Sequence, residues 1–308
     1  MELSRIGVHE SVGEVFPPER LVEALSDLDR DVAVVGTGDL ADYDAVVTFE
    51  YDDAFADPVA WIHSIQAGVD RFPFETLEER GVALTNSTGI HGESVGEMVV
   101  GYMIALARQF PQYVRNQRDH AWRRPAWDRP FTLDGESICV VGLGTLGRGI
   151  ATRAAALGMS VTGVRRSGDP VEGVETVHPP GDLLAAVRDA RFVALAVPLT
   201  DETRDLVGAR ELAAMDDDAY LINVARGPVV DEDALVEALR EGEIAGAALD
   251  VFETEPLPAS SPLWDREDVV VTPHVAATVR SYYEDVADLV RENVRRVDDG
   301  EEIINRVV

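Results

Sequence analysis

Three polar side chains of this sequence could do chemistry: Arg226, Glu255 and His274, each of which follows an apolar run. An imidazole exchanges protons near neutral pH, and a guanidinium binds a carboxylate through two parallel hydrogen bonds. All three lie downstream of a turn with glycines at 142, 144 and 147, a spacing typical of turns that hold a phosphate at a helix N-terminus. A phosphorylated coenzyme beside a proton donor and an anion-binding arginine indicates an oxidoreductase.

The glycine-rich turn lies between a predicted strand, Ile138–Val141, and a predicted helix, Arg148–Leu157. In such a turn the first glycine permits a tight bend, the second lets the backbone approach a pyrophosphate, and the third lets helix and strand pack closely. This context favours a dinucleotide site over a plain strand-to-helix turn. The predicted coenzyme contacts at the turn are Gly142, Gly144, Thr145, Leu146 and Gly147.

The end of the next predicted strand, Val161–Val164, indicates which dinucleotide is bound. Enzymes that use NAD usually carry an acidic residue there, which bonds the ribose 2′-hydroxyl. This chain instead has Arg165, Arg166 and Ser167. Two guanidiniums and a hydroxyl suit a 2′-phosphate, so we predict NADP(H) as the preferred coenzyme and NAD(H) as a second option. The alternative is that both arginines are ordinary surface residues.

The charge of the chain is extreme, because 57 acidic and 27 basic residues give a formal net charge of -30 over 308 residues. Every basic residue is an arginine. Molar salt shortens the Debye length to about 3 Å and removes most of the self-repulsion of such a surface. The acids are spread along the chain rather than blocked in a tail, so we interpret the composition as halophilic, typical of a salt-accumulating cytoplasm. The same charge argues against nucleic acid as a partner.

Length and composition restrict the class of protein further. Two domains are expected for a chain of this length. No apolar run approaches the roughly 20 residues of a membrane span and no signal pattern opens the chain, so a cytoplasmic protein with no membrane partner is predicted. Cys139 lies within an apolar run and is expected to be buried. The six histidines show no shared ligand spacing, so no metal site is predicted.

Short apolar runs alternate with helical patterns, which predicts an α/β fold with parallel sheets. A long helix is predicted from about Glu93 to Arg118, and a last helix over Ser281–Val297 precedes Ile303–Val308, a segment able to return to the first domain. The predicted strands of the first domain are Arg5–Val8, Val32–Val35, Ala45–Thr48, Ile62–Ile65 and Ala83–Thr85. Those of the second are Ile138–Val141, Val161–Val164, Phe192–Val197, Tyr220–Asn223, Ala247–Asp250 and Val269–Thr272, a number that fits a doubly wound dinucleotide fold.

A dense set of motifs covers the second half of the chain. These are Gly142–Gly147, Val197–Thr203, Leu221–Gly227, Val230–Leu235, Leu249–Pro256 and Thr272–His274. Together they resemble the D-2-hydroxyacid dehydrogenase family over nearly the whole chain. The segment Gly89–Glu97, with Arg108, Pro111 and Trp122, is similar to the glyoxylate/hydroxypyruvate-reductase-like branch of that family.

The resemblance implies a fold of two doubly wound α/β domains. A Rossmann coenzyme domain over 93–277 is inserted into a flavodoxin-like substrate-binding domain made of 1–92 and 278–308. The hinges are then expected near Gly92 and Ala277. The implied activity is hydride transfer between NADP(H) and a small 2-oxo or 2-hydroxy acid, as a D-2-hydroxyacid dehydrogenase or 2-oxoacid reductase.

The family also implies roles for the three polar residues. His274 is the expected general acid toward the substrate carbonyl oxygen, and Glu255 orients its imidazole and stabilises the protonated form. Arg226 is expected to hold the substrate carboxylate. Further predicted coenzyme contacts are Val197, Pro198, Thr203, Val224, Ala225, Asp250, His274 and Ala276, where Asp250 is the carboxamide-binding acid. Further predicted substrate contacts are Ala67, Gly68, Val69, Tyr51 and Met98, with Phe49 also lining an apolar side-chain pocket.

Two further expectations come from the family. An alternative function is that of a coenzyme-sensing, corepressor-like binding protein of the same fold, which measurable turnover would exclude. A homodimer is expected, paired through the Glu93–Arg118 helix and the arm around Trp122–Phe131. Because the sequence stops soon after its last predicted helix, we expect it to lack the regulatory extension of many phosphoglycerate dehydrogenases.

Overall fold

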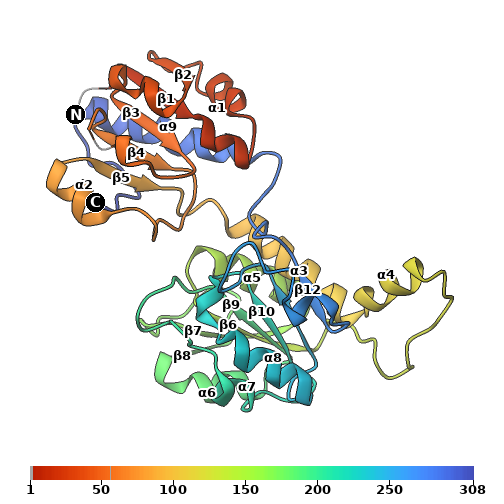
Figure 1. The fold of residues 1–308 in the computed structure, drawn as a ribbon. Helices are drawn as coiled ribbons and strands as arrows, with labels where there is room; N and C mark the ends of the chain where they lie inside the picture. The colour runs from red at the N-terminus through yellow and green to blue at the C-terminus, as the bar shows by residue number, and fades with distance from the viewer. Residues whose placement is uncertain (1–2, 56) are drawn as a thin grey trace. The chain divides into compact units, whose positions relative to one another are not determined.

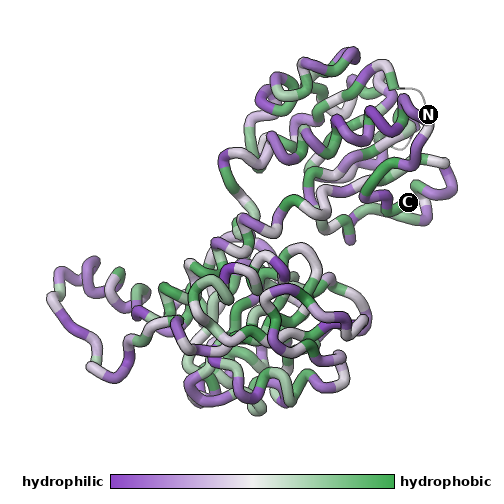
Figure 2. Tube along the Cα trace, turned by 180° about the vertical axis from the view of Figure 1, so that it is seen from behind, coloured by the Kyte–Doolittle hydropathy of each residue, from purple (hydrophilic) through white to green (hydrophobic). Residues whose placement is uncertain are grey.

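A computed structural model describes residues 3–55 and 57–308 of the chain. The chain divides into two compact units, one made of Met1–Ile90 with Thr278–Val308 and the other of His91–Ala277 (Figure 1). Figure 2 shows hydrophobic segments gathered inside each unit. Hydrophilic residues dominate the arm that projects from the second unit, which comprises residues 108–129. The predicted α/β class with two parallel sheets is confirmed.

The first unit contains a five-stranded parallel sheet in the order β2-β1-β3-β4-β5, the flavodoxin-like order. Helix α9 repeats apolar residues every four positions, at Val286, Val290 and Val294, and this stripe packs into the core of the sheet. The strands are β1 (Arg5–His9), β2 (Asp31–Val35), β3 (Ala45–Thr48), β4 (Trp61–Ser64) and β5 (Ala83–Asn86). The α-helices are α1 (Pro18–Ala24), α2 (Phe74–Arg80) and α9 (Tyr282–Asp299), with 3-10 helices η1 (Glu10–Glu14), η2 (Thr37–Asp42) and η3 (Asp53–Phe55).

The C-terminal segment returns to this unit, as the sequence predicted. The Val307 N–H donates to the Leu84 carbonyl over 2.8 Å, and the Asn86 N–H donates to the Asn305 carbonyl over 3.2 Å. Both bonds lie along β5, at the edge of the sheet. Residues from both ends of the chain therefore complete one core.

The second unit contains a seven-stranded parallel sheet in the order β12-β11-β10-β9-β6-β7-β8. The chain starts at β6, runs outward to β8, and then crosses to β9 and continues to β12. The order thus reverses between β6 and β9, the place where doubly wound sheets bind ligands at their carboxyl edge. The strands are β6 (Ser137–Val141), β7 (Ser160–Val164), β8 (Thr176–His178), β9 (Phe192–Leu195), β10 (Tyr220–Asn223), β11 (Gly246–Leu249) and β12 (Val269–Val271).

Helices cover both faces of this sheet. Helices α3 (Gly92–Ala107) and α5 (Thr145–Ala156) share one buried cluster with the sheet, and α6 (Leu183–Arg188), α7 (Ala209–Leu212) and α8 (Glu232–Glu241) share the other. Cys139 is buried in the second of these clusters, as expected. The 3-10 helices are η4 (Pro180–Asp182), η5 (Gly227–Val229) and η6 (Pro262–Asp265).

Two predictions about the elements of this unit were wrong. The long helix predicted over Glu93–Arg118 ends at Ala107, and α4 (Phe110–Arg118) starts after Gln109, whose φ is 60°. Pro111 explains the break, because its ring clashes with the carbonyl four residues earlier in a continuous helix. The short edge strand β8 was not predicted, since three residues show no readable alternation.

Candidate active site

The glycine-rich turn joins β6 to α5. Gly142 has a φ of 97°, and a Cβ there would lie 2.6 Å from the Ala196 carbonyl oxygen, so only glycine fits. A Cβ at Gly147 would lie 1.8 Å from the Gly142 carbonyl oxygen. At Gly144, by contrast, an added Cβ would meet no described atom within 4 Å. The turn therefore leaves room beside Gly144, at the N-terminus of α5, where a pyrophosphate would fit.

The segment predicted to select the coenzyme begins beside this turn. The Gly142 N–H donates to the carbonyl of Val164, the last residue of β7, over 2.9 Å. Arg165 follows, and its N–H donates to the His178 carbonyl over 3.1 Å. The two residues after it, Arg166 and Ser167, are exposed. The structure thus places both arginines at the carboxyl end of β7, next to the turn.

Other predicted coenzyme residues follow β9 and β10, the next strands of the sheet. The Ala196 N–H donates to the Val141 carbonyl over 2.8 Å, so the loop after β9 starts beside the glycine-rich turn. The Thr203 hydroxyl closes this loop by donating to the Pro198 carbonyl over 2.6 Å. The predicted contacts at these two strand ends are Val197, Pro198, Thr203, Val224 and Ala225.

His274 and Glu255 form a direct pair. The distance from His274 Nδ1 to Glu255 Oε2 is 2.8 Å, and both side chains are partly exposed. Glu255 Oε1 accepts a bond from the Phe252 N–H over 3.0 Å, which fixes the carboxylate from its other side. Burial raises the pKa of Glu255, but the bonds from His274 and Phe252 and the charge of Arg226 outweigh it and leave the pKa below its usual value. The carboxylate is therefore ionised at neutral pH and holds the imidazole through Nδ1.

Arg226 follows β10 directly and belongs to the same group of charges. Its Nη1 donates to the Ala225 carbonyl over 2.7 Å, and its own carbonyl accepts from Asn223 Nδ2 over 3.1 Å. Gly227 then packs so tightly on the next loop that a Cβ there would lie 1.8 Å from the Phe252 carbonyl carbon. This contact brings the loop of Arg226 against the loop that carries Glu255. Asn223 was not predicted, although an asparagine that ends a buried strand is a readable signal.

Asp250 lies at the end of β11 and is 1% exposed. Its carboxylate accepts from the Val275 N–H and the Ala276 N–H, both over 2.9 Å, and its carbonyl accepts from the His274 N–H over 2.8 Å. The residue therefore fixes the backbone that carries His274. Its predicted contact with the nicotinamide carboxamide, and that of Ala276 with the coenzyme, stay predictions.

His91 precedes α3 and is 5% exposed. Burial, together with the charge of Arg226, lowers the pKa of His91 to about 4. It is therefore a neutral imidazole near Arg226, in the same unit. His91 was not among the predicted site residues, because its burial cannot be read from the neighbouring residues.

The predicted substrate residues are divided between the two units. The turn Ala67–Val69 and Tyr51 belong to the first unit, where Asn86 Nδ2 donates to the Ala67 carbonyl over 2.7 Å. The Tyr51 ring packs 5.5 Å from the ring of Phe72 and 6.0 Å from that of Phe55, so it forms part of that unit's core. Met98 lies on α3 in the second unit, partly buried.

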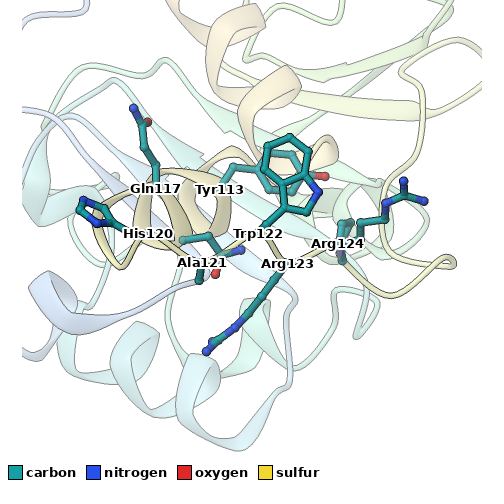
Figure 3. Close-up of a pocket in the computed structure, with 9 residues that line it drawn as sticks. Tyr113, Gln117, His120, Ala121, Trp122, Arg123 and Arg124 are labelled. Carbon is teal, nitrogen blue, oxygen red and sulfur yellow. The ribbon is translucent and has the colours of Figure 1, made fainter.

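A cavity of about 590 Å³ lies on the arm of the second unit (Figure 3). None of the three predicted catalytic residues lines it. Trp122 is one of the residues that line this cavity, and it is 99% exposed. The cavity is lined by Tyr113, Asn116, Gln117, His120, Ala121, Trp122, Arg123, Arg124 and Pro125. This cavity is therefore a feature of the arm, unrelated to the residues that could do chemistry.

Within 3–55 and 57–308, no group of three His, Cys, Asp or Glu side chains could hold a metal ion. In the same ranges, none of the helices combines the length and the apolar character needed to cross a bilayer.

Comparison with known families decides the membership of the chain. Residues 100–276 match the family model described as D-isomer specific 2-hydroxyacid dehydrogenase, NAD binding domain, which is more than half of the chain. The chain belongs to the D-isomer specific 2-hydroxyacid dehydrogenase family. The matched residues contain the glycine-rich turn as well as Arg226, Glu255 and His274.

Relatives of this chain include enzymes with several names. The chain is 35% identical over 309 residues to the glyoxylate reductase of Thermofilum pendens. This match covers 97% of the chain and 87% of the relative. The chain is 34% identical over 305 residues to the D-3-phosphoglycerate dehydrogenase of Methanocaldococcus jannaschii, in a match that covers 96% of the chain. The match spans 56% of that longer relative.

The fold of this chain is shared with solved structures. A D-isomer specific 2-hydroxyacid dehydrogenase from Xanthobacter autotrophicus, solved in complex with NADPH and MES, matches with a TM-score of 0.85 and 32% identity. The match covers 100% of this chain and 98% of that one. The predicted Rossmann fold, joined to a second α/β domain, is thereby confirmed.

Proposed function

We propose that this chain is a D-2-hydroxyacid dehydrogenase that works as a 2-oxoacid reductase, with hydride transfer between NADP(H) and a small 2-oxo acid. The observation that carries the proposal is the His274–Glu255 pair at 2.8 Å, with the loop of Glu255 packed against that of Arg226. All three residues follow neighbouring strands at the edge of the sheet where the glycine-rich turn lies. The names of the relatives support an enzyme and give no support to the corepressor-like alternative.

In the proposed reaction, the bound nicotinamide supplies a hydride to C2 of the oxo acid. His274 donates a proton to the carbonyl oxygen, so the C=O bond becomes C–OH and the product is a 2-hydroxy acid. Glu255 keeps Nδ1 bonded, which leaves Nε2 as the nitrogen that donates. Arg226 binds the substrate carboxylate through its planar fork.

The substrate class we propose is that of the glyoxylate/hydroxypyruvate-reductase-like branch. The glyoxylate reductase of Thermofilum pendens, with a match over 97% of this chain, supports this choice. Tyr51, Phe49 and Met98 stay the predicted residues of an apolar side-chain pocket, and Ala67–Val69 stays the predicted turn for the carboxylate. We assign substrate binding to 1–92 with 278–308 and coenzyme binding to 93–277.

The coenzyme preference we propose is for NADPH. Arg165, Arg166 and Ser167 lie beside the glycine-rich turn, where an adenosine 2′-phosphate would be bound. The related Xanthobacter autotrophicus enzyme was solved with NADPH, which supports the same preference here.

The test is the rate of coenzyme oxidation in molar KCl with 2-oxoisocaproate, glyoxylate or hydroxypyruvate. We expect faster turnover with NADPH than with NADH. Replacing both Arg165 and Arg166 by alanine should raise the KM for NADPH by at least about 100-fold, because each lost charge-assisted bond is worth about 1.5–3 kcal/mol. The KM for NADH should stay within about twofold, since NADH has no 2′-phosphate.

The matched control is the adjacent arginine pair on the arm, Arg123→Ala with Arg124→Ala. This variant should keep the ratio of the two KM values. An unchanged ratio in the Arg165/Arg166 variant would reject the 2′-phosphate assignment and leave the chemistry standing. No rate with any oxo acid and either coenzyme would reject the proposed function.

We also propose a homodimer formed through the arm of the second unit. Trp122 and Trp127 on this arm are 99% and 93% exposed, more than any other large apolar residue described. Residues 108–129 contain six arginines and two aspartates, so the arm is positive on a chain whose net charge is -30. An acidic copy of the same chain is a complementary partner for such an arm.

Light scattering in molar KCl should therefore give twice the chain mass of 33.5 kDa. Replacing Trp122 and Trp127 by alanine should give monomers, whereas Trp264→Ala, a half-exposed tryptophan off the arm, should leave the dimer intact. A monomeric wild type would reject the dimer.

Finally, we propose that the protein is adapted to a salt-accumulating cytoplasm. The self-repulsion of a surface with a net charge of -30 is the supporting observation. Circular dichroism of the same samples tests it, since the folded signal should weaken in dilute buffer and return in molar KCl. A signal independent of salt would contradict the adaptation.

A further inference from the structure

The backbone of His274 has a φ of 54°, in the left-handed region that non-glycine residues rarely adopt. Such a conformation costs of order 1 kcal/mol and persists only when the surroundings impose it. Here the surroundings are Asp250 and the residues bonded to it, because the N–H groups of His274, Val275 and Ala276 all donate to Asp250. The position of the His274 imidazole therefore depends on how firmly Asp250 itself is held.

A chain of two hydroxyl groups holds Asp250 from the side of α3. The Thr272 hydroxyl lies 2.6 Å from Asp250 Oδ1, to which it donates. Thr272 has one hydroxyl proton, so the Tyr102 hydroxyl, 2.6 Å away, must be the donor to Thr272 Oγ1. A longer contact of 3.4 Å joins the Tyr102 hydroxyl to Asp250 Oδ1 directly. The proton order thus runs from Tyr102 to Thr272 to Asp250.

Tyr102 is a rigid anchor for this chain of bonds. It is 4% exposed and sits in the buried cluster of α3, with Val99, Met103 and Leu106 on the same helix. Burial raises the pKa of Tyr102, with the charge of Asp250 acting in the same direction, so the phenol stays protonated and remains a donor. Tyr102 lies far from His274 in the sequence but only two side chains away from its loop.

We propose that Tyr102 is a positioning residue for the reaction, which fixes His274 through Thr272 and Asp250 and thereby keeps Nδ1 on Glu255. This inference rests on the proposed function of His274 as the proton donor. Tyr102 touches neither substrate nor coenzyme in this scheme. Its hydroxyl determines how often the imidazole has the orientation needed for proton transfer.

The test is Tyr102→Phe, which removes one oxygen and keeps the ring in the core. We expect kcat for oxo-acid reduction to fall about tenfold, because small displacements of a catalytic group are costly, while both KM values stay within about twofold. Hydrogen exchange of the peptide spanning residues 272–277 should become faster. The control is Tyr220→Phe, a buried tyrosine at the opposite end of the same sheet, which should change neither kcat nor this exchange.

A second variant guards against a folding defect. Thr272→Val removes the bridging hydroxyl from the partly buried loop, and the double variant with Tyr102→Phe should be no slower than the slower single one. Multiplicative effects, or a Tyr102→Phe enzyme with wild-type kcat and exchange, would overturn the inference. If the wild type reduces no oxo acid, the proposed function fails. The hydrogen-exchange measurement still tests the role of Tyr102 in that case, because unchanged exchange at 272–277 in Tyr102→Phe would overturn it.

Discussion

His274→Asn should lower kcat for reduction of the 2-oxo acid about a thousandfold, within the range of 10²–10⁴ that a general acid contributes. The amide cannot donate a proton to the carbonyl oxygen as an imidazolium does. Asparagine tolerates the left-handed backbone of this position, where φ is 54°, so the variant is expected to fold. Stopped-flow or steady-state rates at saturating coenzyme measure the effect.

The matched control is His120→Asn on the arm. His120 also has a positive φ, 53°, and is exposed, so the same change of side chain is made in a similar backbone conformation. Its rates should equal those of the wild type. Equal rates for His274→Asn and wild type would reject the assignment of the proton donor.

The pH dependence follows from the same pair. The pKa of Glu255 lies below its usual value, so this group stays ionised through the neutral range and does not shape the profile there. Reduction needs the imidazolium of His274, so kcat/KM for reduction should fall as the pH rises, whereas oxidation of the hydroxy acid should become faster. Glu255→Gln should lower kcat for reduction, because His274 Nδ1 loses the charged acceptor that holds it.

Arg226→Gln should lower kcat/KM for the oxo acid roughly a thousandfold. Removal of one partner from a close charge pair costs about 2–5 kcal/mol, and the substrate carboxylate would lose its fork-shaped partner. Arg226→Lys should recover part of the loss, since the charge remains and the bidentate geometry does not. The dissociation constant of NADPH, measured by fluorescence titration, should change little.

Arg210→Gln is the control for this substitution. Arg210 is exposed on α7 in the same unit, so it removes the same charge away from the proposed site. Its kcat/KM should match the wild type. An Arg226→Gln enzyme with full kcat/KM, or one that loses only coenzyme affinity, would contradict the role in carboxylate binding.

Much of this fold could be predicted because its signals are local. The glycine-rich turn lies between a buried strand and a helix, so its three glycines have few alternative explanations. Parallel strands such as Tyr220–Asn223 are continuous apolar runs that stand out from the sequence. The break at Gln109 was missed although Pro111 is a readable helix-breaking signal, and the three residues of β8 are too few to show a pattern.

The site could be predicted only in part, for a related reason. Arg226, Glu255 and His274 each lie in a motif, so their types and positions were readable. Their supports were not, because Tyr102 meets Thr272 and Asp250 across 170 and 148 positions of the sequence. The close approach of Gly227 to the next loop also depends on packing, which no local pattern encodes.

The shared core of the first unit has a consequence for synthesis on the ribosome. Residues up to Ile90 emerge first, yet their core includes Val286, Val290 and Val294 of α9, near the end of the chain. The second unit is contained in His91–Ala277 and is complete before α9 has been translated. Domains usually mature in the order in which they are made. In this protein the unit whose synthesis starts first is completed after the second unit, so its apolar strands lack part of their core until α9 has been translated.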